Sequence, residues 1–320
     1  MEKAIIAFTK KGRQLIQKIN DAASTAGIRP AIDYSGKDIS AYDFAQSASE
    51  KGMALIFVGA AGIAVRAVAG LVKDKLTDCP VIVIDDNGRF VIPLIAGHAG
   101  GANKIAVTIA KLIDAVPVIT TSTDVNGAFS ADVFAAENHL TIRNREGIRS
   151  VSAGALEGKS VTISIKDYPP KEKTDIIIAD ETDREYSLLL SPKRYVVGIG
   201  MRKGKDPDEC ERFIIKVLEE NGLTVNDVYA VATIDIKEDE PAIRQFSNRH
   251  RIPVITFEAE ILKRVQGDFT PSEFVEETTG VDNVCERAAV LAAGVGAALI
   301  CKKQKGDGMT AAIAKRGSKE

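Results

Sequence analysis

The sequence predicts an α/β protein made of two open α/β/α sandwich domains joined by a small α+β connector. Its 320 residues are enough for two domains, because a domain averages roughly 150 residues. Short apolar runs alternate with amphipathic stretches in the first third, as strands alternate with crossover helices in a parallel sheet. The same alternation begins afresh at Tyr195. We therefore expect an N-terminal domain at 1–125, a connector at 126–192 and a C-terminal domain at 193–320.

Four apolar runs of β-favouring residues predict the strands of the first domain, at 3–8, 53–58, 80–85 and 116–120. The stretch Asp85-Asp86-Asn87-Gly88 contains the Asn-Gly pair of a tight hairpin turn. Residues 89–94 are therefore expected to add one antiparallel strand to the sheet. The next helix carries a single apolar stripe, which predicts that it lies on the sheet; the stripe consists of Ile105, Ile109, Leu112 and Ile113.

The connector differs from the first domain in its sequence pattern, because polar residues separate its predicted elements. A helix is predicted near 132–138, and β-like runs occur at 160–165 and 175–178. The polar stretch after the helix contains Arg143, Arg145 and Arg149 and predicts no element of its own. Residues 167–173 are rich in proline and charge, which predicts a solvated loop.

The last domain has a helix whose ends are marked by Asp206 and Pro207 at its start and by Gly222 past its end. Its apolar stripe contains Cys210, Phe213, Ile214, Val217 and Leu218. Strands are expected at 195–199, 228–234, 253–257, 297–302 and 309–314, and further helices at 240–249 and 283–293. These elements predict a second α/β domain.

Composition and charge exclude several classes of protein. The 42 basic and 44 acidic residues leave a net charge of −2, so no global field draws the chain onto nucleic acid or an anionic membrane. The lack of tryptophan argues against base-stacking platforms. The four cysteines form no C-x-x-C pair, which argues against a zinc cluster or disulfide framework and fits a reducing cytoplasm. The longest uncharged run, fourteen residues at 288–301, is shorter than the roughly 20 residues of a membrane span, and the N-terminal apolar stretch is too short for a secretory signal.

Two glycine-rich junctions between a predicted strand and a helix mark a candidate site. They are Gly59-Ala60-Ala61-Gly62 and Gly97-His98-Ala99-Gly100-Gly101-Ala102-Asn103. At such junctions the free N–H groups of a helix start attract anions, and glycine lets a ligand approach the backbone. We therefore expect an anion-binding crevice. Glycine that only relieves strain in a tight turn is the alternative. Neither junction matches the P-loop or the G-x-G-x-x-G fingerprint.

His98 is the candidate acid or base of this crevice, because glycines flank it and imidazole titrates near neutral pH. A histidine that bonds only its own loop is the alternative. Arg66 is placed to reach an anion at the crevice, although solvated helix positions are the usual fate of such charges. Residues 120–124, Thr-Thr-Ser-Thr-Asp, form either a turn or a polar wall of the crevice.

The remaining polar motifs have simpler expectations. His139 and His250 lie in polar stretches and are expected at the surface, and no spacing of histidines and carboxylates indicates a metal held by the protein. The acidic stretch 238–240 before Pro241 is expected to supply acidic residues to a helix start. In the last domain, Gly198-Ile199-Gly200 misses the dinucleotide fingerprint by one residue. Basic residues beside this turn and the final one predict a local basic rim, made of Arg202, Lys203, Lys205, Lys302, Lys303 and Lys305.

The glycine junctions belong to a series of motifs that runs along nearly the whole chain. In the first domain the series occupies 59–66, 85–94, 97–103 and 117–121, and it continues at 132–135, 198–204, 237–241 and 303–305. In this order and spacing the motifs resemble the cobalt-precorrin-5A hydrolases, the CbiG family of anaerobic cobalamin biosynthesis. The Gly-His-x-Gly-Gly-Ala-Asn stretch is the most specific element of the resemblance. Met201 departs from the family, which often has cysteine there, so a thiol at this position is not needed for chemistry in this chain.

The resemblance implies a three-part architecture and a reaction on a cobalt-bearing tetrapyrrole. Water opens the lactone on ring A, and the extruded meso carbon leaves with its methyl group as acetaldehyde. Cobalt arrives within the substrate, so no cofactor is expected. The chain lacks the G-x-S-x-G elbow of serine hydrolases, which favours direct attack by water over an acyl-enzyme.

We therefore expect His98 to act as general base, with Asp124 as the second catalytic candidate. The expected substrate-binding residues are Gly59, Gly62, Arg66, Gly97, Gly100, Gly101, Asn103, Thr121, Gly200 and Arg202. The expected partner is the corrinoid, with no nucleic acid and no membrane, and a homo-oligomer or contacts with neighbouring pathway enzymes are compatible with the sequence. Two other functions remain open at this point: a corrinoid carrier that does not hydrolyse its ligand, and a nicotinamide-dependent oxidoreductase, which the defective fingerprint disfavours.

Overall fold

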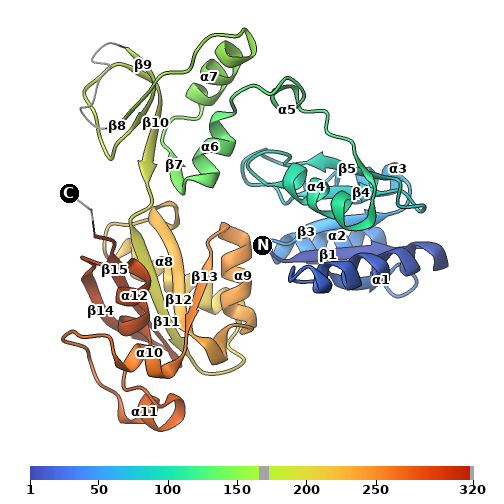
Figure 1. Ribbon diagram of the computed structural model, residues 1–320. Coiled ribbons are helices and arrows are strands. Elements are labelled where there is room, and N and C mark those ends of the chain that lie inside the picture. The colour runs from blue at the N-terminus through green and yellow to red at the C-terminus, as the bar shows by residue number, and fades with distance from the viewer. Residues whose placement is uncertain (166–172, 318–320) are drawn as a thin grey trace. The chain divides into compact units, whose positions relative to one another are not determined.

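The computed structural model describes residues 1–165 and 173–317. The chain divides into two compact units, Met1–Ser191 and Pro192–Glu320, each with helices packed against β-sheets (Figure 1). The first unit contains two sheets and the second contains one. This mixed α/β architecture confirms the predicted fold class. The finer division of the first unit into 1–125 and 126–192 stays a prediction, and the loop predicted at 167–173 lies outside the described residues except for Lys173.

The larger sheet of the first unit has six strands in the order β2-β1-β3-β4-β5-β6. Strands β1 to β4 are parallel, β5 is antiparallel to β4 as the Asn-Gly turn predicted, and β6 is parallel to β5. β2 and β3 lie on opposite sides of β1, so the direction in which strands are added to the sheet reverses after β2. The point of the sheet at which the strand order reverses lies between β1 and β3. The strands are β1 (Lys3–Ala7), β2 (Ile32–Ser35), β3 (Ala54–Val58), β4 (Val81–Ile84), β5 (Phe90–Ile95) and β6 (Val116–Pro117).

Helices cover both faces of this sheet (Figure 1). The apolar residues of α1 (Lys10–Thr25) and α4 (Ala102–Ile113) pack with Ile5, Ile56 and Ile82 on one face. Those of α2 (Ala41–Glu50) and α3 (Ala61–Val68) pack with Leu55 and Phe57 on the other. Every residue of β3 and β4 is buried, because successive side chains point to opposite faces and both faces are covered. The stripe predicted for α4 packs into this core, with Ile109 and Ile113 buried and Ile105 and Leu112 partly buried.

The reversal at β5 decides where the two glycine junctions lie. Gly59 follows β3 at the carboxyl ends of the parallel strands. Gly97 follows β5, and Ile95 at the end of β5 pairs with Val81 at the beginning of β4. The two junctions therefore lie at opposite ends of the strands, roughly 15 Å apart along the strand direction. The expectation of one crevice shared by both junctions is wrong, because the hairpin turns the chain back before His98.

The second sheet of the first unit has four strands in the order β7-β10-β9-β8. The predicted helix near 132–138 and the two predicted strands are present. The polar stretch with three arginines forms a strand and a helix that were not predicted, because its apolar face is narrow: Ile148 and Val151 are the buried aliphatic residues of the helix α7. The elements are α5 (Ser122–Val125), α6 (Ala131–Glu137), β7 (Leu140–Ile142), α7 (Glu146–Leu156), β8 (Ile163–Ile165), β9 (Thr174–Ile178) and β10 (Tyr186–Pro192).

The second unit is built on a five-stranded sheet in the order β13-β12-β11-β15-β14. Its strands are β11 (Tyr195–Met201), β12 (Val228–Ile234), β13 (Val254–Phe257), β14 (Ala298–Gly306) and β15 (Met309–Lys315). Apolar residues of α8 (Pro207–Glu219) and α9 (Pro241–His250) cover one face, and those of α10 (Ala259–Lys263) and α12 (Cys285–Ala293) cover the other. The Asp206 side chain accepts a hydrogen bond from the Glu209 N–H at 2.9 Å and caps α8, as predicted. A short helix that the sequence did not predict, α11 (Glu273–Thr279), has no buried residue.

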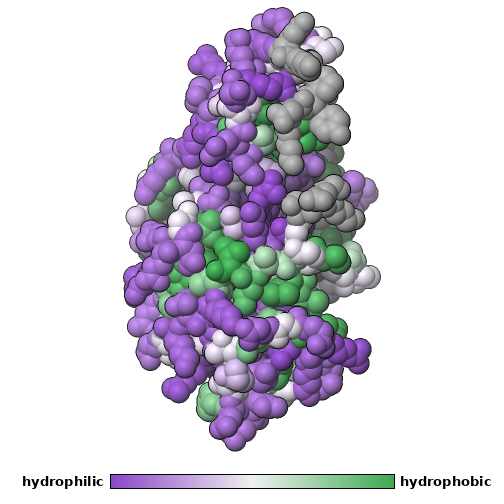
Figure 2. Space-filling view, turned by 90° about the vertical axis from the view of Figure 1, so that its left-hand side faces the viewer, coloured by the Kyte–Doolittle hydropathy of each residue, from purple (hydrophilic) through white to green (hydrophobic). Residues whose placement is uncertain are grey.

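The edge strand β14 changes character along its length. Its first half is apolar and includes the exposed Ile300. Hydrophobic side chains gather on this side of the second unit (Figure 2). Its second half carries Lys302, Lys303 and Lys305. Lysines on an exposed strand edge oppose pairing with another sheet, because a partner strand would bury their charges.

Gly198 in β11 is required by the close approach of α12. A Cβ atom at this position would lie 1.8 Å from the carbonyl oxygen of Cys285 and 2.9 Å from the Cβ of Ala289. Gly198, the first glycine of the Gly-Ile-Gly motif, therefore serves helix–strand packing, and the whole motif lies within β11 rather than in a turn.

Replacing Gly198 by alanine is expected to lower the free energy of unfolding by about 1–3 kcal/mol, the usual cost of overpacking a core. Urea denaturation of the full chain measures it. Gly154→Ala is the control, because its Cβ would meet only Cδ of the Lys159 side chain, at an ordinary contact distance of 3.8 Å. Equal unfolding midpoints for the two variants would contradict the assigned packing role.

Candidate active site

His98 lies between two carboxylates contributed by two later segments of the first unit. Its Nε2 atom is 2.7 Å from Oδ2 of Asp124, and its Nδ1 atom is 3.5 Å from Oδ1 of Asp132. The loop before α4 carries the histidine, α5 carries Asp124 and α6 carries Asp132. The His98 side chain is 16% exposed, that of Asp124 39% and that of Asp132 7%. The inner carboxylate is therefore shielded from water, whereas the outer one is accessible.

Ser130 links the histidine to the inner carboxylate. Its hydroxyl donates a hydrogen bond to Oδ1 of Asp132 at 2.5 Å and lies 3.3 Å from Nδ1 of His98. The Asp132 carboxylate also accepts the Val133 N–H at 3.1 Å. On the other side of the ring, the buried hydroxyl of Thr123 lies 3.0 Å from Nε2. These contacts fix the plane of the imidazole.

The arrangement shifts the pKa of both ionisable partners. The hydrogen bond with Asp132 raises the pKa of His98 above 6.5; burial opposes this shift, and the hydrogen bond with Asp124 adds to it. Burial on its own would raise the pKa of Asp132, but the hydrogen bonds with His98 and Ser130 outweigh it and hold this pKa at about 2. Asp132 is therefore ionised throughout the physiological pH range, and His98 is a stronger base than a free imidazole.

Asn103 joins the outer carboxylate to the start of α5. Its side-chain amide donates to Oδ2 of Asp124 at 2.9 Å and to Oγ1 of Thr121 at 3.1 Å. The predicted residues His98, Asn103, Thr121 and Asp124 thus meet in one cluster. Of the two interpretations of residues 120–124, the polar wall is supported, because Thr121, Thr123 and Asp124 all turn their side chains towards it.

The glycines around His98 shape the loop that presents it. A Cβ on Gly97 would lie 2.8 Å from Oδ1 of Asn103, and one on Gly100 would lie 2.3 Å from the Cβ of Ala96. Gly101 has a φ of 84° and caps α4 in a left-handed conformation. Glycine is needed at these positions for the conformation of the loop. Their expected role in binding substrate stays a prediction.

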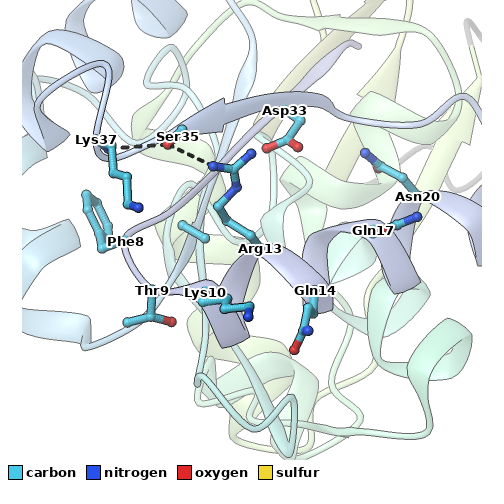
Figure 3. A pocket seen from close by; sticks show the side chains of 11 residues that line it. Phe8, Thr9, Lys10, Arg13, Gln14, Gln17, Asn20, Asp33, Ser35 and Lys37 are labelled. Atoms are coloured by element: carbon cyan, nitrogen blue, oxygen red, sulfur yellow. Dashed lines mark hydrogen bonds between the residues drawn. The ribbon is translucent and has the colours of Figure 1, made fainter.

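Gly59, Gly62 and Arg66 lie at the opposite edge of the sheet. The Arg66 guanidinium folds back and donates to the carbonyl oxygen of Gly62 at 3.1 Å. At this edge the first strand-to-helix turn and the end of β2 form a groove of about 450 Å³. Figure 3 shows Lys10, Arg13 and Lys37 around it. These cations were not predicted as site residues, although the basic run after the first strand was a visible signal. The expected role of Gly59, Gly62 and Arg66 in binding substrate stays a prediction.

Gly200 and Arg202 lie in the second unit, where both line a cavity at the carboxyl end of β11. The turn that follows is held by Glu240, which accepts the Gly204 N–H at 2.7 Å and pairs with Lys237 at 3.0 Å. Residues 238–240 do lie at a helix start, as expected, and Glu240 is the N-cap residue of α9. This carboxylate is buried and holds the loop, and its side chain makes no capping hydrogen bond to α9.

The other candidate groups have structural roles. His250 is half-buried and bonds Glu211 at 2.7 Å, contrary to the expected surface position, whereas His139 is exposed as expected. All four cysteines are free thiols. Burial raises the pKa of Cys285 to about 11 and that of Cys210 to about 12, so neither thiol ionises at neutral pH. Within residues 1–165 and 173–317, no group of three or more His, Cys, Asp or Glu side chains is arranged to hold a metal ion, and no helix combines the length and the apolar character of a membrane span.

Comparison with known proteins places these motifs in a family. The family profile described as Cobalamin synthesis G N-terminal matches residues 43–124, and that described as Cobalamin synthesis G C-terminus matches residues 195–314. The cobalt-precorrin-5A hydrolase of Salmonella typhimurium is 33% identical over 264 residues, which cover 74% of this chain and 75% of that protein. The chain belongs to the CbiG family.

Two further relatives extend the match along the chain. The cobalt-precorrin-5A hydrolase of Priestia megaterium is 28% identical over 285 residues, covering 79% of this chain and 76% of that protein. A probable cobalt-precorrin-5A hydrolase of Methanocaldococcus jannaschii is 29% identical over 331 residues, covering 97% of this chain and 98% of that protein. His98 and Asp124 fall inside the N-terminal profile match, whereas Ser130 and Asp132 lie between the two matches.

Asp132 and Ser130 were not predicted as site residues, because their sequence has an ordinary structural explanation. A Ser-x-Asp stretch before an apolar run is typical of a helix start, and Asp132 does lie in the first turn of α6. The signal that pointed further was the place of residues 132–135 among the motifs of the CbiG resemblance.

Proposed function

We propose that this chain is a cobalt-precorrin-5A hydrolase of cobalamin biosynthesis. Water opens the ring-A lactone, and the extruded carbon leaves with its methyl group as acetaldehyde, which gives cobalt-precorrin-5B. The membership of the CbiG family supports the substrate and the reaction. The His98 cluster supplies the acid–base chemistry that a hydrolysis of this kind needs.

The observation that carries the mechanism is the histidine held between an accessible and a shielded carboxylate. His98 takes the proton from the attacking water as general base. Asp132 holds the ring and stabilises the imidazolium that forms, as a buried carboxylate does behind a catalytic histidine. Asp124 is the exposed member of the cluster, and its Oδ1 accepts no hydrogen bond from the described residues. That oxygen is available to orient water or a hydroxyl group of the substrate.

The proposal includes no resident metal or cofactor, since cobalt enters as part of the substrate. The corrinoid carries acetate and propionate groups, which suit the N–H groups and cations expected at Gly100, Gly101 and Arg202. We place the reaction in the cytoplasm, in line with the free thiols.

The direct test is to incubate the purified protein with cobalt-precorrin-5A and to measure both acetaldehyde and the mass of the corrinoid. Acetaldehyde should appear in step with loss of the two-carbon unit from the corrinoid. Binding of the substrate without any change in its mass would overturn the hydrolase and favour a carrier.

A further inference from the structure

The second unit contains a cavity of about 670 Å³ at the carboxyl end of β11. Its walls come from the ends of β11, β14 and β15, from the turn after β12, and from α11 with the segment that joins it to α12. All of its lining residues belong to this unit. The volume lies within the range of small-molecule sites, roughly 300–1,000 Å³.

The cavity is apolar inside and has large apolar side chains exposed at its mouth. Val284 and Met309 are buried in its lining. Ile236 is 65% exposed and Phe274 is 61% exposed, and both line the same cavity. Exposed large apolar side chains that converge on a cavity indicate a surface that a ligand covers.

The basic rim predicted from the sequence divides into two groups in the structure. Arg202, Lys203, Lys303 and Lys305 line the cavity, and none of them pairs with a carboxylate of the described residues. Lys205 and Lys302 do not line it; Lys205 pairs with Glu209 and Asp307, and Lys302 pairs with Asp268. The cations without an internal counter-charge are therefore those that face the cavity.

The cations lie on both sides of the cavity. Arg202 and Lys203 follow β11, whereas Lys303 and Lys305 belong to β14, and β15 runs between these two strands. Two strand spacings separate the groups by roughly 10 Å. A single small anion does not reach across this distance, whereas a broad apolar body with several carboxylates on its periphery does.

The frame of the cavity is rigidly bonded. The fully buried Glu286 accepts the Thr270 N–H at 2.7 Å and the Lys303 N–H at 2.6 Å, which fixes the segment before α11 against β14. Lys303 Nζ donates to the Thr270 carbonyl oxygen at 2.7 Å. The Arg202 guanidinium lies 5.8 Å from the centre of the Phe274 ring, close enough for a cation–π contact across the mouth.

We propose that this cavity binds the tetrapyrrole itself, with the macrocycle on the apolar surface between Ile236 and Phe274 and its peripheral carboxylates on Arg202, Lys203, Lys303 and Lys305. The proposal rests on the function proposed above, because that function supplies a ligand of this chemistry. It assigns corrinoid recognition to the second unit and proton transfer to the His98 cluster of the first. Substitutions in the cavity then change affinity, and substitutions at His98 change the chemical step.

The test uses the full chain and two corrinoid probes, cobyrinic acid, whose peripheral groups are free carboxylates, and its fully methyl-esterified form. Equilibrium dialysis followed by corrinoid absorbance gives the dissociation constants. The unmodified chain should bind the acid at least about tenfold more tightly than the ester, because charge-assisted hydrogen bonds need the carboxylates. The double variant Lys203→Gln/Lys305→Gln should weaken binding of the acid by about tenfold.

The matched control is Lys205→Gln/Lys302→Gln, which removes the same charge from neighbouring positions that do not line the cavity. It should bind the acid within about twofold of the unmodified chain. Equal weakening by both double variants would show a bulk charge effect and overturn the proposal, as would equal affinity for acid and ester. The acetaldehyde assay separates the two proposals. Turnover with an unchanged KM in Lys203→Gln/Lys305→Gln overturns the cavity site alone, whereas lack of turnover with selective binding of the acid overturns the hydrolase alone.

Discussion

His98→Ala is expected to lower kcat for acetaldehyde release by about 10²–10⁴, the usual contribution of a positioned general base. The ring is the only imidazole in the cluster, and the carboxylates and hydroxyls that contact it are weaker bases. KM should change little, because the variant removes a proton acceptor and leaves the cations in place. Steady-state assays with cobalt-precorrin-5A measure both constants.

His139→Ala is the matched control, because this exposed histidine should leave kcat unchanged. His98→Gln keeps a hydrogen-bonding side chain in the loop and guards against a folding defect in the alanine variant. A folded His98 variant that turns over near the unmodified rate would remove this residue from the mechanism.

Asp132→Asn is expected to lower kcat by about 10- to 100-fold and to move the pH profile. The sign follows from the base role: activity requires neutral His98, so kcat/KM rises with pH around the pKa of this residue in the free enzyme. In the unmodified chain Asp132 raises that pKa above 6.5, so the midpoint of the rise lies above pH 6.5. Loss of the carboxylate removes the largest cause of the shift, and the midpoint moves to lower pH.

The pH profile separates positioning from mere stability, because a variant that only folds less well loses activity without a shift of the midpoint. Glu137→Gln in the same helix is the control; its carboxylate lies 3.9 Å from Lys104 and outside the His98 cluster. This control should keep the midpoint of the unmodified chain. A midpoint that stays fixed in Asp132→Asn would rule out the proposed role of Asp132.

Much of the fold could be predicted because apolar periodicity and turn residues are local signals. The α8 stripe with its Asp206 cap and the antiparallel strand after Asn87-Gly88 were both predicted correctly. The helices α7 and α11 were missed, because α7 buries few aliphatic residues and α11 buries none. Where tertiary contacts supply the stabilisation, the sequence pattern alone carries little of the information.

The sequence predicted several residues of the candidate site correctly, but it did not predict how all of the expected residues are arranged in the fold. His98, Asn103, Thr121 and Asp124 meet as a cluster, although 26 positions separate His98 from Asp124. The error concerned Gly59, Gly62 and Arg66, which were expected at the same crevice. The direction of a strand determines the end of the sheet at which its loop emerges, and the reversal at β5 places the His98 loop at the end opposite to Gly59.

The division of the His98 cluster between chain segments has a consequence for proton affinity. Asp132 belongs to the segment beyond the N-terminal family match, so a boundary drawn at residue 125 cuts the cluster in two. By thermodynamic linkage, the contact of α6 with the His98 loop and the uptake of a proton by the imidazole must strengthen each other equally. In a chimera that joins residues 1–125 of this chain to the following segment of a relative, the pKa of His98 would therefore depend on residues from both proteins.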